Sequence, residues 1–109
     1  MATKIEFVNA LLACCARVYV ANQSPSKPVY PLILYEQTQK KAILYADNKP
    51  YMQSTGYWVY LYAKESLTML EGLVDVALGN LGYSGRLIRE STNGAVISRI
   101  YEYTNNEEV

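Results

Sequence analysis

The chain has 109 residues, half of them hydrophobic and 18% charged, with ten basic residues balancing ten acidic ones and no histidine. This length favours one domain over residues 1–109, and the composition is that of a globular fold rather than a disordered chain. The neutral charge argues against a dedicated nucleic-acid binder, which usually carries an excess of basic residues. The absence of histidine excludes Ser-His-Asp catalysis, Cys-His catalysis and histidine metal sites.

Membrane insertion and metal binding are also not expected. No stretch reaches the roughly 18 apolar residues that a bilayer span needs, and Glu6, Asn9 and Arg17 interrupt the apolar N-terminal segment. We therefore expect a protein made and kept in the cytoplasm. The two cysteines, Cys14 and Cys15, cannot form a four-ligand zinc site. We interpret them as core-facing residues in a reducing compartment, with a redox switch as the alternative, and we expect no cofactor.

A first helix is predicted over Lys4–Ala16. Thr3 and Glu6 have the spacing of a capping box, which satisfies two backbone donors at a helix start. The expected buried stripe consists of Ile5, Val8, Leu12 and Cys15, with Phe7 and Leu11 beside it. The proline-rich "NQSPSKPVYP" that follows is predicted to be an irregular crossing segment.

Three strands are predicted next. Tyr30–Gln37 and Lys41–Ala46 are β-favouring runs, and the polar "QTQK" between them suggests a hairpin with its tip at Gln37–Lys41. "ADNKPY" has turn chemistry, with Pro50 expected to stop regular pairing. Tyr51–Ala63 has the aromatic and β-branched content of a central strand.

A second helix and two final strands complete the prediction. Ser66 is the expected N-cap, and Gly82 fits a left-handed position after the helix. Arg86–Ser91 and Ala95–Tyr103 are predicted strands, joined through the hairpin signal "TNG". Residues 104–109 are expected to be a flexible tail that could order on assembly. The apolar stripe expected on the helix is Leu67, Leu70, Leu73, Val74, Ala77, Leu78 and Leu81.

The resulting order, α–β–β–β–α–β–β, predicts an α+β fold. Because helices and strands do not alternate regularly, we expect a mostly antiparallel sheet with both helices packed on one face. The other face of the sheet would then be exposed, and its aromatic side chains need an explanation. Alternation along residues 57–62 places Tyr57, Val59 and Leu61 on one face and Trp58, Tyr60 and Tyr62 on the other.

Trp58, Tyr60 and Tyr62 are therefore candidate interface aromatics, because interfaces favour residues with a large apolar body and a polar tip. Core packing is the main alternative. A stacking platform for single-stranded nucleic acid is another, although only Lys49 and Lys64 flank the tyrosine-rich run.

Catalysis is not expected. The sequence has no glycine-rich phosphate cradle at the start of a helix. Four carboxylates could serve as acids or bases, but nothing in the sequence places two of them together; they are Glu36, Asp47, Asp75 and Glu90.

Several short motifs resemble the small tail-completion, or tail terminator, proteins of long-tailed bacteriophages or prophages of Gram-positive bacteria. The family pattern has a "PYIVY"-like strand, an "ADN-x-x-Y" turn, a strand-to-helix junction and a "YE-V-x-YEF"-like closing strand. This chain has "YPLILYE" (Tyr30–Glu36), Ala46, Asp47, Asn48 and Tyr51, then "YLYAKESLTMLEG", and finally "ISRIYEY" (Ile97–Tyr103).

The resemblance implies a non-enzymatic protein of the virion neck, assembled in the host cytoplasm. Such proteins form a ring, usually a hexamer, that caps the tail tube, ends tail polymerisation and joins the tail to the head. The implied partners are other copies of the chain, the major tail tube protein and a head-connector or head-closure protein. Genomic DNA would pass through without specific binding. Another head–tail connector or head-closure role stays open.

The candidate contact residues come from the predicted hairpin tip, the family-like turn and the aromatic strand. Lys40 and Lys41 could equally be solvated charges, and Asp47 and Asn48 could only shape the backbone. The full set is Gln37, Lys40, Lys41, Asp47, Asn48, Tyr51, Trp58, Tyr60 and Tyr62.

Overall fold

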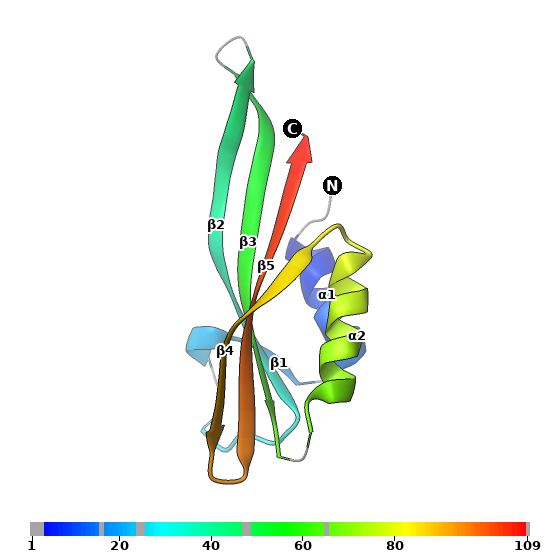
Figure 1. Cartoon of the computed structure of the whole chain (residues 1–109), viewed down its shortest axis with the longest axis vertical. Coiled ribbons are helices and arrows are strands. Elements are labelled where there is room, and N and C mark those ends of the chain that lie inside the picture. The colour runs from blue at the N-terminus through cyan, green and yellow to red at the C-terminus, as the bar shows by residue number, and fades with distance from the viewer. Residues whose placement is uncertain (1–3, 16, 24–25, 47–48, 65, 109) are drawn as a thin grey trace.

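The computed structural model describes residues 4–15, 17–23, 26–46, 49–64 and 66–108. At residues 39–46, 49–53, 93 and 106–108 it describes the backbone. The elements are α1 (Lys4–Cys14), β1 (Val18–Val20), the 3-10 turn η1 (Ala21–Gln23), β2 (Leu32–Ala46), β3 (Lys49–Ala63), α2 (Thr68–Gly79), β4 (Ser84–Asn93) and β5 (Val96–Glu108) (Figure 1).

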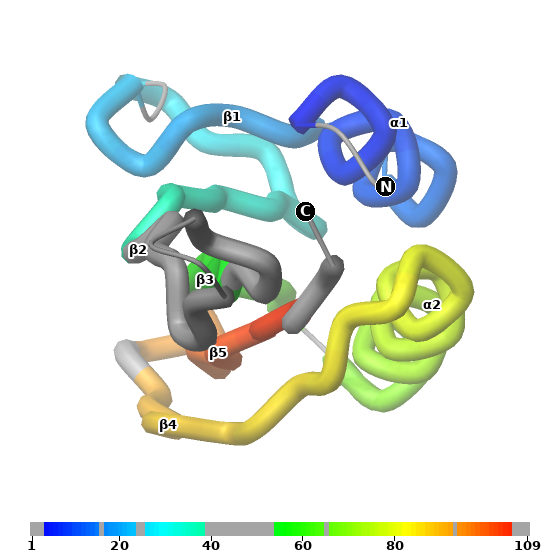
Figure 2. The backbone as a smooth tube through the Cα atoms, turned by 90° about the horizontal axis from the view of Figure 1, so that it is seen from above, coloured from blue at the N-terminus to red at the C-terminus, as the bar shows by residue number. Residues whose placement is uncertain are grey.

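The strands form one five-stranded sheet in the order β1-β2-β3-β5-β4. Among the described strands, β1 and β2 pair in parallel, whereas the pairs β2–β3, β3–β5 and β4–β5 are antiparallel. Both helices lie on the same side of this sheet (Figure 2). The predicted α+β class and mostly antiparallel sheet are therefore confirmed.

The order of helices and strands also agrees with the prediction. However, the first two observed strands, β1 and β2, do not correspond to the first two predicted strands. The predicted hairpin between Tyr30–Gln37 and Lys41–Ala46 is wrong, because β2 runs unbroken through both segments. "QTQK" contains no glycine, proline, asparagine or aspartate, so nothing in it favours a tight turn. A register shift between Gln37 and Gln39 accommodates this polar segment within the strand.

The missing strand is β1, which is too short for its periodicity to be detected. It pairs with Ile33–Tyr35 of β2, and the proline-rich segment makes the connection that a parallel pair requires. Pro50 does not stop pairing as predicted, since it lies opposite Tyr45 at the start of β3. Proline is tolerated near the first residue of a strand, where a missing ladder donor costs little.

The predicted flexible tail is also wrong for residues 104–108, which belong to β5. Thr104 pairs with Gly56 and Glu108 with Met52. The Asn105 side chain is 7% exposed, and its Nδ2 donates a hydrogen bond to the Leu81 carbonyl at 3.2 Å. The polar sequence concealed this strand because its partner on β3 is distant in the chain.

Helix α1 buries a different face from the predicted one. Phe7, Leu11 and Cys15 are buried, whereas Ile5 is 73% exposed and Leu12 is 43% exposed. The buried positions recur every four residues, so Phe7 and Leu11 lie on one side of the helix. Cys15 continues this side just after the helix ends. The helix ends at Cys14 rather than Ala16, and the predicted cap Thr3 lies outside the described residues.

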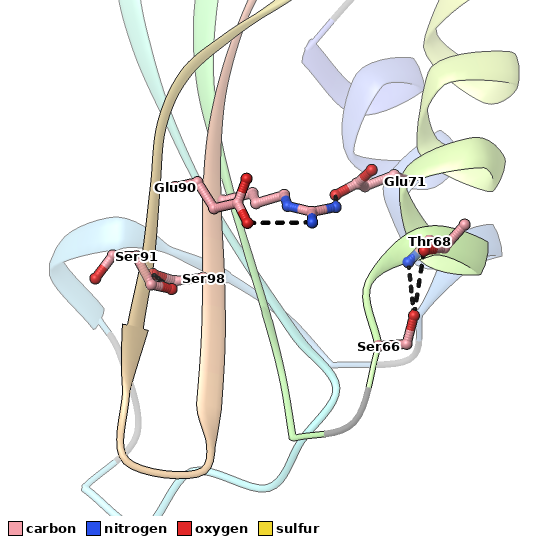
Figure 3. Close-up of polar contacts among 7 residues, drawn as sticks. Ser66, Thr68, Glu71, Glu90, Ser91 and Ser98 are labelled. Carbon is pink, nitrogen blue, oxygen red and sulfur yellow. Dashed lines mark hydrogen bonds and ion pairs between the residues drawn. The ribbon is translucent and has the colours of Figure 1, made fainter.

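Helix α2 follows the prediction more closely. It begins one residue later than expected, with Leu67 at the N-cap position, but the Ser66 hydroxyl still accepts a hydrogen bond from the Thr68 backbone N–H at 3.2 Å (Figure 3). Leu73, expected in the buried stripe, is 49% exposed. Gly82 has a φ of 93°, which confirms the left-handed position.

One hydrophobic core fills the space between the helices and the sheet face that they cover. Its sheet residues include Tyr57, Val59 and Leu61, as the alternation predicts. The other buried members are Phe7, Leu11, Cys15, Ile33, Tyr35, Ala63, Leu67, Leu70, Val74, Leu78, Tyr83 and Tyr103.

Candidate interaction surface on the open face of the sheet

The sheet face opposite the helices carries a row of aromatic and acidic side chains. We call this surface the aromatic face and define it by Trp58, Tyr60 and Tyr62 of β3, Glu36 of β2 and Glu102 of β5. Glu36 and Glu102 are the register partners of Trp58 on its two sides. All five side chains are half-buried, and none belongs to the core beneath the helices.

Hydrogen bonds fix the orientation of the two central rings. The Tyr60 hydroxyl donates to Glu36 Oε1 at 2.5 Å, and the Trp58 indole N–H donates to Glu102 Oε2 at 3.3 Å. The Trp58 and Tyr60 rings meet edge to face, with centroids 6.4 Å apart. The polar tips of these aromatics are therefore directed to carboxylates.

The same environment changes the acidity of the tyrosines. Burial is the main reason that the pKa of Tyr60 is raised well above its ordinary value, and the hydrogen bond and negative charge of Glu36 raise it further. Burial also raises the pKa of Tyr62, with a smaller contribution from Tyr30. Both phenols therefore stay protonated at neutral pH, and the Tyr60 hydroxyl keeps the proton that it donates to Glu36.

The chain itself covers one end of the aromatic face. Pro28 and Tyr30 line a cavity of about 200 Å³ together with Leu32, Leu34 and Tyr62. Leu32 and Leu34 are only 3% and 7% exposed, although they lie outside the core beneath the helices. Tyr62 is thus packed by the proline-rich segment, and Trp58 and Tyr60 are the better candidates for a contact with another molecule.

The other predicted contact residues lie elsewhere on the strands or outside the described residues. Gln37 is exposed within β2, and Lys40 and Lys41 pair with Thr55 and Ser54 in the strand, so the turn predicted at Gln37–Lys41 does not form. Tyr51 lies on β3, where the structure describes its backbone. Asp47 and Asn48 lie outside the described residues.

Two residues of the aromatic face, and one residue paired with them, were missing from the predicted contact set. They are Glu36, Glu102 and Arg86, whose Nη2 lies 3.0 Å from Glu102 Oε1. Their grouping follows from the register, since Arg86 pairs with Glu102 and Glu102 with Trp58. A cross-strand row cannot be read from the sequence until the partners of β3 are known.

A second surface lies on the helix side of the sheet. We call it the α2 cleft; its volume is about 400 Å³, and its lining residues are Thr68, Glu71, Gly72, Asp75, Tyr101 and Tyr103. Burial followed by the charge of Asp75 raises the pKa of Tyr103, and burial followed by Glu71 raises that of Tyr101.

Arg99 organises the charges beside the cleft. It forms an ion pair with Glu71 of α2 and a second with Glu90 of β4, the latter at 3.3 Å (Figure 3). The guanidinium therefore links the helix to the edge of the sheet. Of the carboxylates noted in the sequence, Glu36 lies on the aromatic face and Asp75 in the α2 cleft, so these two are separated.

The cysteines are free. Cys15 is buried, and its thiol donates to the Pro31 carbonyl at 3.4 Å; Cys14 is half-buried and donates to Ala10 at 3.3 Å. Burial and the neighbouring Cys15 raise the pKa of Cys14, which makes it a poorer nucleophile.

Two features are absent from the described part of the chain. Neither α1 nor α2, the helices in that part, has the length and apolarity that crossing a bilayer would take. Among the same residues, no group of three or more acidic, cysteine or histidine side chains is placed to hold a metal ion. In comparisons with known proteins, the chain matches no protein-family model and no curated protein.

Proposed function

We propose that this chain is a non-enzymatic structural protein of the neck of a long-tailed bacteriophage. In this proposal it forms a ring, with a hexamer as the expected form, that caps the tail tube and joins it to the head. Its partners are other copies of itself, the major tail tube protein and a head-connector or head-closure protein. The short motifs that resemble tail terminators suggest this specific role.

The observation that carries the proposal is the chemistry of the aromatic face. Trp58 and Tyr60 present large half-buried rings whose polar tips bind carboxylates. Such residues suit protein–protein contacts, where aromatic bodies are buried and their polar tips find partners. The surface therefore supports a role in assembly.

The same chemistry disfavours the alternative of single-stranded nucleic-acid binding. A stacking platform for nucleic acid places basic residues beside its aromatic rings, because the phosphates must be neutralised. Here the groups beside the rings are Glu36 and Glu102, and Arg86 is already paired with Glu102. Carboxylates at these positions would repel a phosphate backbone.

Electron cryomicroscopy of the intact particle tests the proposal. We expect ring density for this chain between the head connector and the tail tube. A phage that lacks the chain should produce tails of irregular length that are not joined to heads. Absence of the chain from purified virions would reject the proposal.

Because Trp58 is the only tryptophan, its fluorescence tests the nucleic-acid alternative directly. We expect no quenching when single-stranded oligonucleotides are added at low salt. Salt-sensitive quenching that is lost in Tyr60→Ala would instead support the nucleic-acid module.

A further inference from the structure

The α2 cleft is an acidic groove with aromatic walls. Glu71 and Asp75 come from α2, which has no lysine or arginine in its sequence, and Tyr101 and Tyr103 come from β5. Arg99 offsets the charge of Glu71 but not that of Asp75. The groove therefore suits a segment that is both basic and apolar.

The elements around this groove, α2 and β4, also carry exposed apolar side chains. Leu87, the register partner of Tyr101, is 47% exposed, and Ile88 is 40% exposed at the register shift in β4. On α2, Met69 is 79% and Val76 is 64% exposed. A segment bound in the cleft could cover part of this apolar surface, and removing apolar surface from water is favourable.

The end of the β2–β3 hairpin has the complementary composition. We call residues 40–52 the hairpin tip; their sequence is KKAILYADNKPYM. Three lysines and one aspartate give the tip a net charge of +2. Its apolar residues are Ala42, Ile43, Leu44, Tyr45, Tyr51 and Met52.

The tip cannot reach the cleft of its own chain. The strands are paired up to Ala46 and Lys49, and the hairpin extends past the helices to one end of the molecule (Figure 1). The cleft lies beside the first half of α2, whose start is toward the other end (Figure 1). Two paired strands of 15 residues, about 50 Å long, do not fold back on themselves.

From this match of charge, apolarity and reach, we propose that the α2 cleft binds the hairpin tip of a second copy of the chain. Each copy then offers one cleft and one tip, so the contact is head-to-tail and can close into a ring. The inference rests on the self-assembly in the proposed function and assigns it one contact between copies, which is separate from the aromatic face.

A steric block of the cleft tests the contact. A Cβ at Gly72 meets nothing within 4 Å, so Gly72→Trp should fold normally and fill the groove. Gly79 is equally open but lies outside the cleft, which makes Gly79→Trp the matched control. In sedimentation velocity of the full chain, wild type and Gly79→Trp should self-associate with concentration, and Gly72→Trp should stay monomeric.

Mixing two defective chains tests the head-to-tail geometry. Lys40→Glu/Lys41→Glu should also be monomeric, whereas Lys27→Glu, at an exposed position outside the tip, should associate as wild type does. Gly72→Trp keeps its tip and the double variant keeps its cleft, so an equal mixture should form a 1:1 heterodimer. Circular dichroism checks that each variant is folded.

Three results would overturn the inference: a wild-type chain that stays monomeric at its highest soluble concentration, a Gly72→Trp chain that associates as wild type does, or a mixture that stays monomeric. These results differ from failure of the neck proposal. A chain that associates through the cleft but is absent from virions would reject the neck role and keep this contact. A neck ring that assembles from the Gly72→Trp chain would reject this contact and keep the neck role.

Discussion

Phe7 connects the helix layer to the sheet. Its ring stacks on Tyr57 with centroids 3.9 Å apart and meets Tyr83 edge to face at 5.2 Å. Aromatic pairs of this kind add about 0.5–1.5 kcal/mol beyond the apolar area that they bury. These ring contacts of Phe7, the only phenylalanine in the sequence, fix which side of α1 faces the core.

Gly85 is required by the ring of a buried tyrosine. A Cβ there would lie 2.7 Å from Cζ and 3.0 Å from Cδ1 of Tyr103, whose side chain is only 2% exposed. We expect Gly85→Ala to lower the free energy of unfolding by about 1–3 kcal/mol in urea titrations. In contrast, Gly72→Ala, in open space on a helix, should raise it by up to about 1 kcal/mol. Equal effects of the two variants would contradict this assignment.

The tyrosines predict a loss of stability at alkaline pH. Burial raises the pKa of Tyr57, Tyr60 and Tyr62 above the ordinary value of 10.0, so folding favours their protonated forms. The resulting stability is fully present below pH 10.0 and is lost as the pH rises above it toward the folded-state values. Urea titrations across this range should show a falling free energy of unfolding.

Tyr60→Phe should reduce that fall, because one of the contributing phenols is removed. Glu36→Gln removes the negative charge but leaves the ring buried, so its pH dependence should lie between those of wild type and Tyr60→Phe. An unchanged slope in Tyr60→Phe would show that this phenol does not contribute.

At the level of elements, α1 offers a direct test of which face is buried. Leu11 is fully buried, whereas its neighbour Leu12 is 43% exposed. Leu11→Ala should cost about 2–5 kcal/mol of the free energy of unfolding, as expected for a leucine removed from a packed core. Leu12→Ala should cost about 0.5 kcal/mol or less. A larger loss for Leu12→Ala than for Leu11→Ala would instead support the buried stripe predicted from the sequence.

Elements with strong local signals could be predicted from the sequence, and those defined by distant pairing could not. The alternation around Trp58 gave the faces of β3, and Gly82 and the Asn93-Gly94 turn marked element ends. The polar residues of β2 and β5 belong to strands only because β3 lies between them. In α1, several apolar positions compete, and the contacts of Phe7 decide among them.

The candidate site was predictable to the same degree. Local alternation predicted that Trp58 and Tyr60 leave the core, because it needs only one strand. Their carboxylate partners depend on the register of three strands, which no local pattern specifies. The α2 cleft likewise depends on where α2 packs, so its acidic residues looked unrelated to Tyr101 in the sequence.

The molecule as a whole is elongated, with extents of 54 × 22 × 21 Å. Its radius of gyration of 15.0 Å exceeds the roughly 13 Å expected for a compact chain of this length. The β2–β3 hairpin accounts for the long axis (Figure 1).

Small-angle X-ray scattering of a monomeric sample should detect this elongation. We expect a radius of gyration near 15.0 Å and a pair-distance distribution with a tail toward long distances. A value near 13 Å with a symmetric distribution would contradict the extended hairpin.

The position of β5 has a consequence for how the protein is made. The last strand of the chain is inserted between β3 and β4, with Ala63 opposite Ile97 and Met52 opposite Glu108. Residues up to Glu108 must therefore have left the ribosome before the sheet can be joined along its full length. Until β5 has been made, the nascent β3 has one unpaired edge, and the sheet cannot be completed. A premature stop codon shortly before Ile97 would leave the sheet divided.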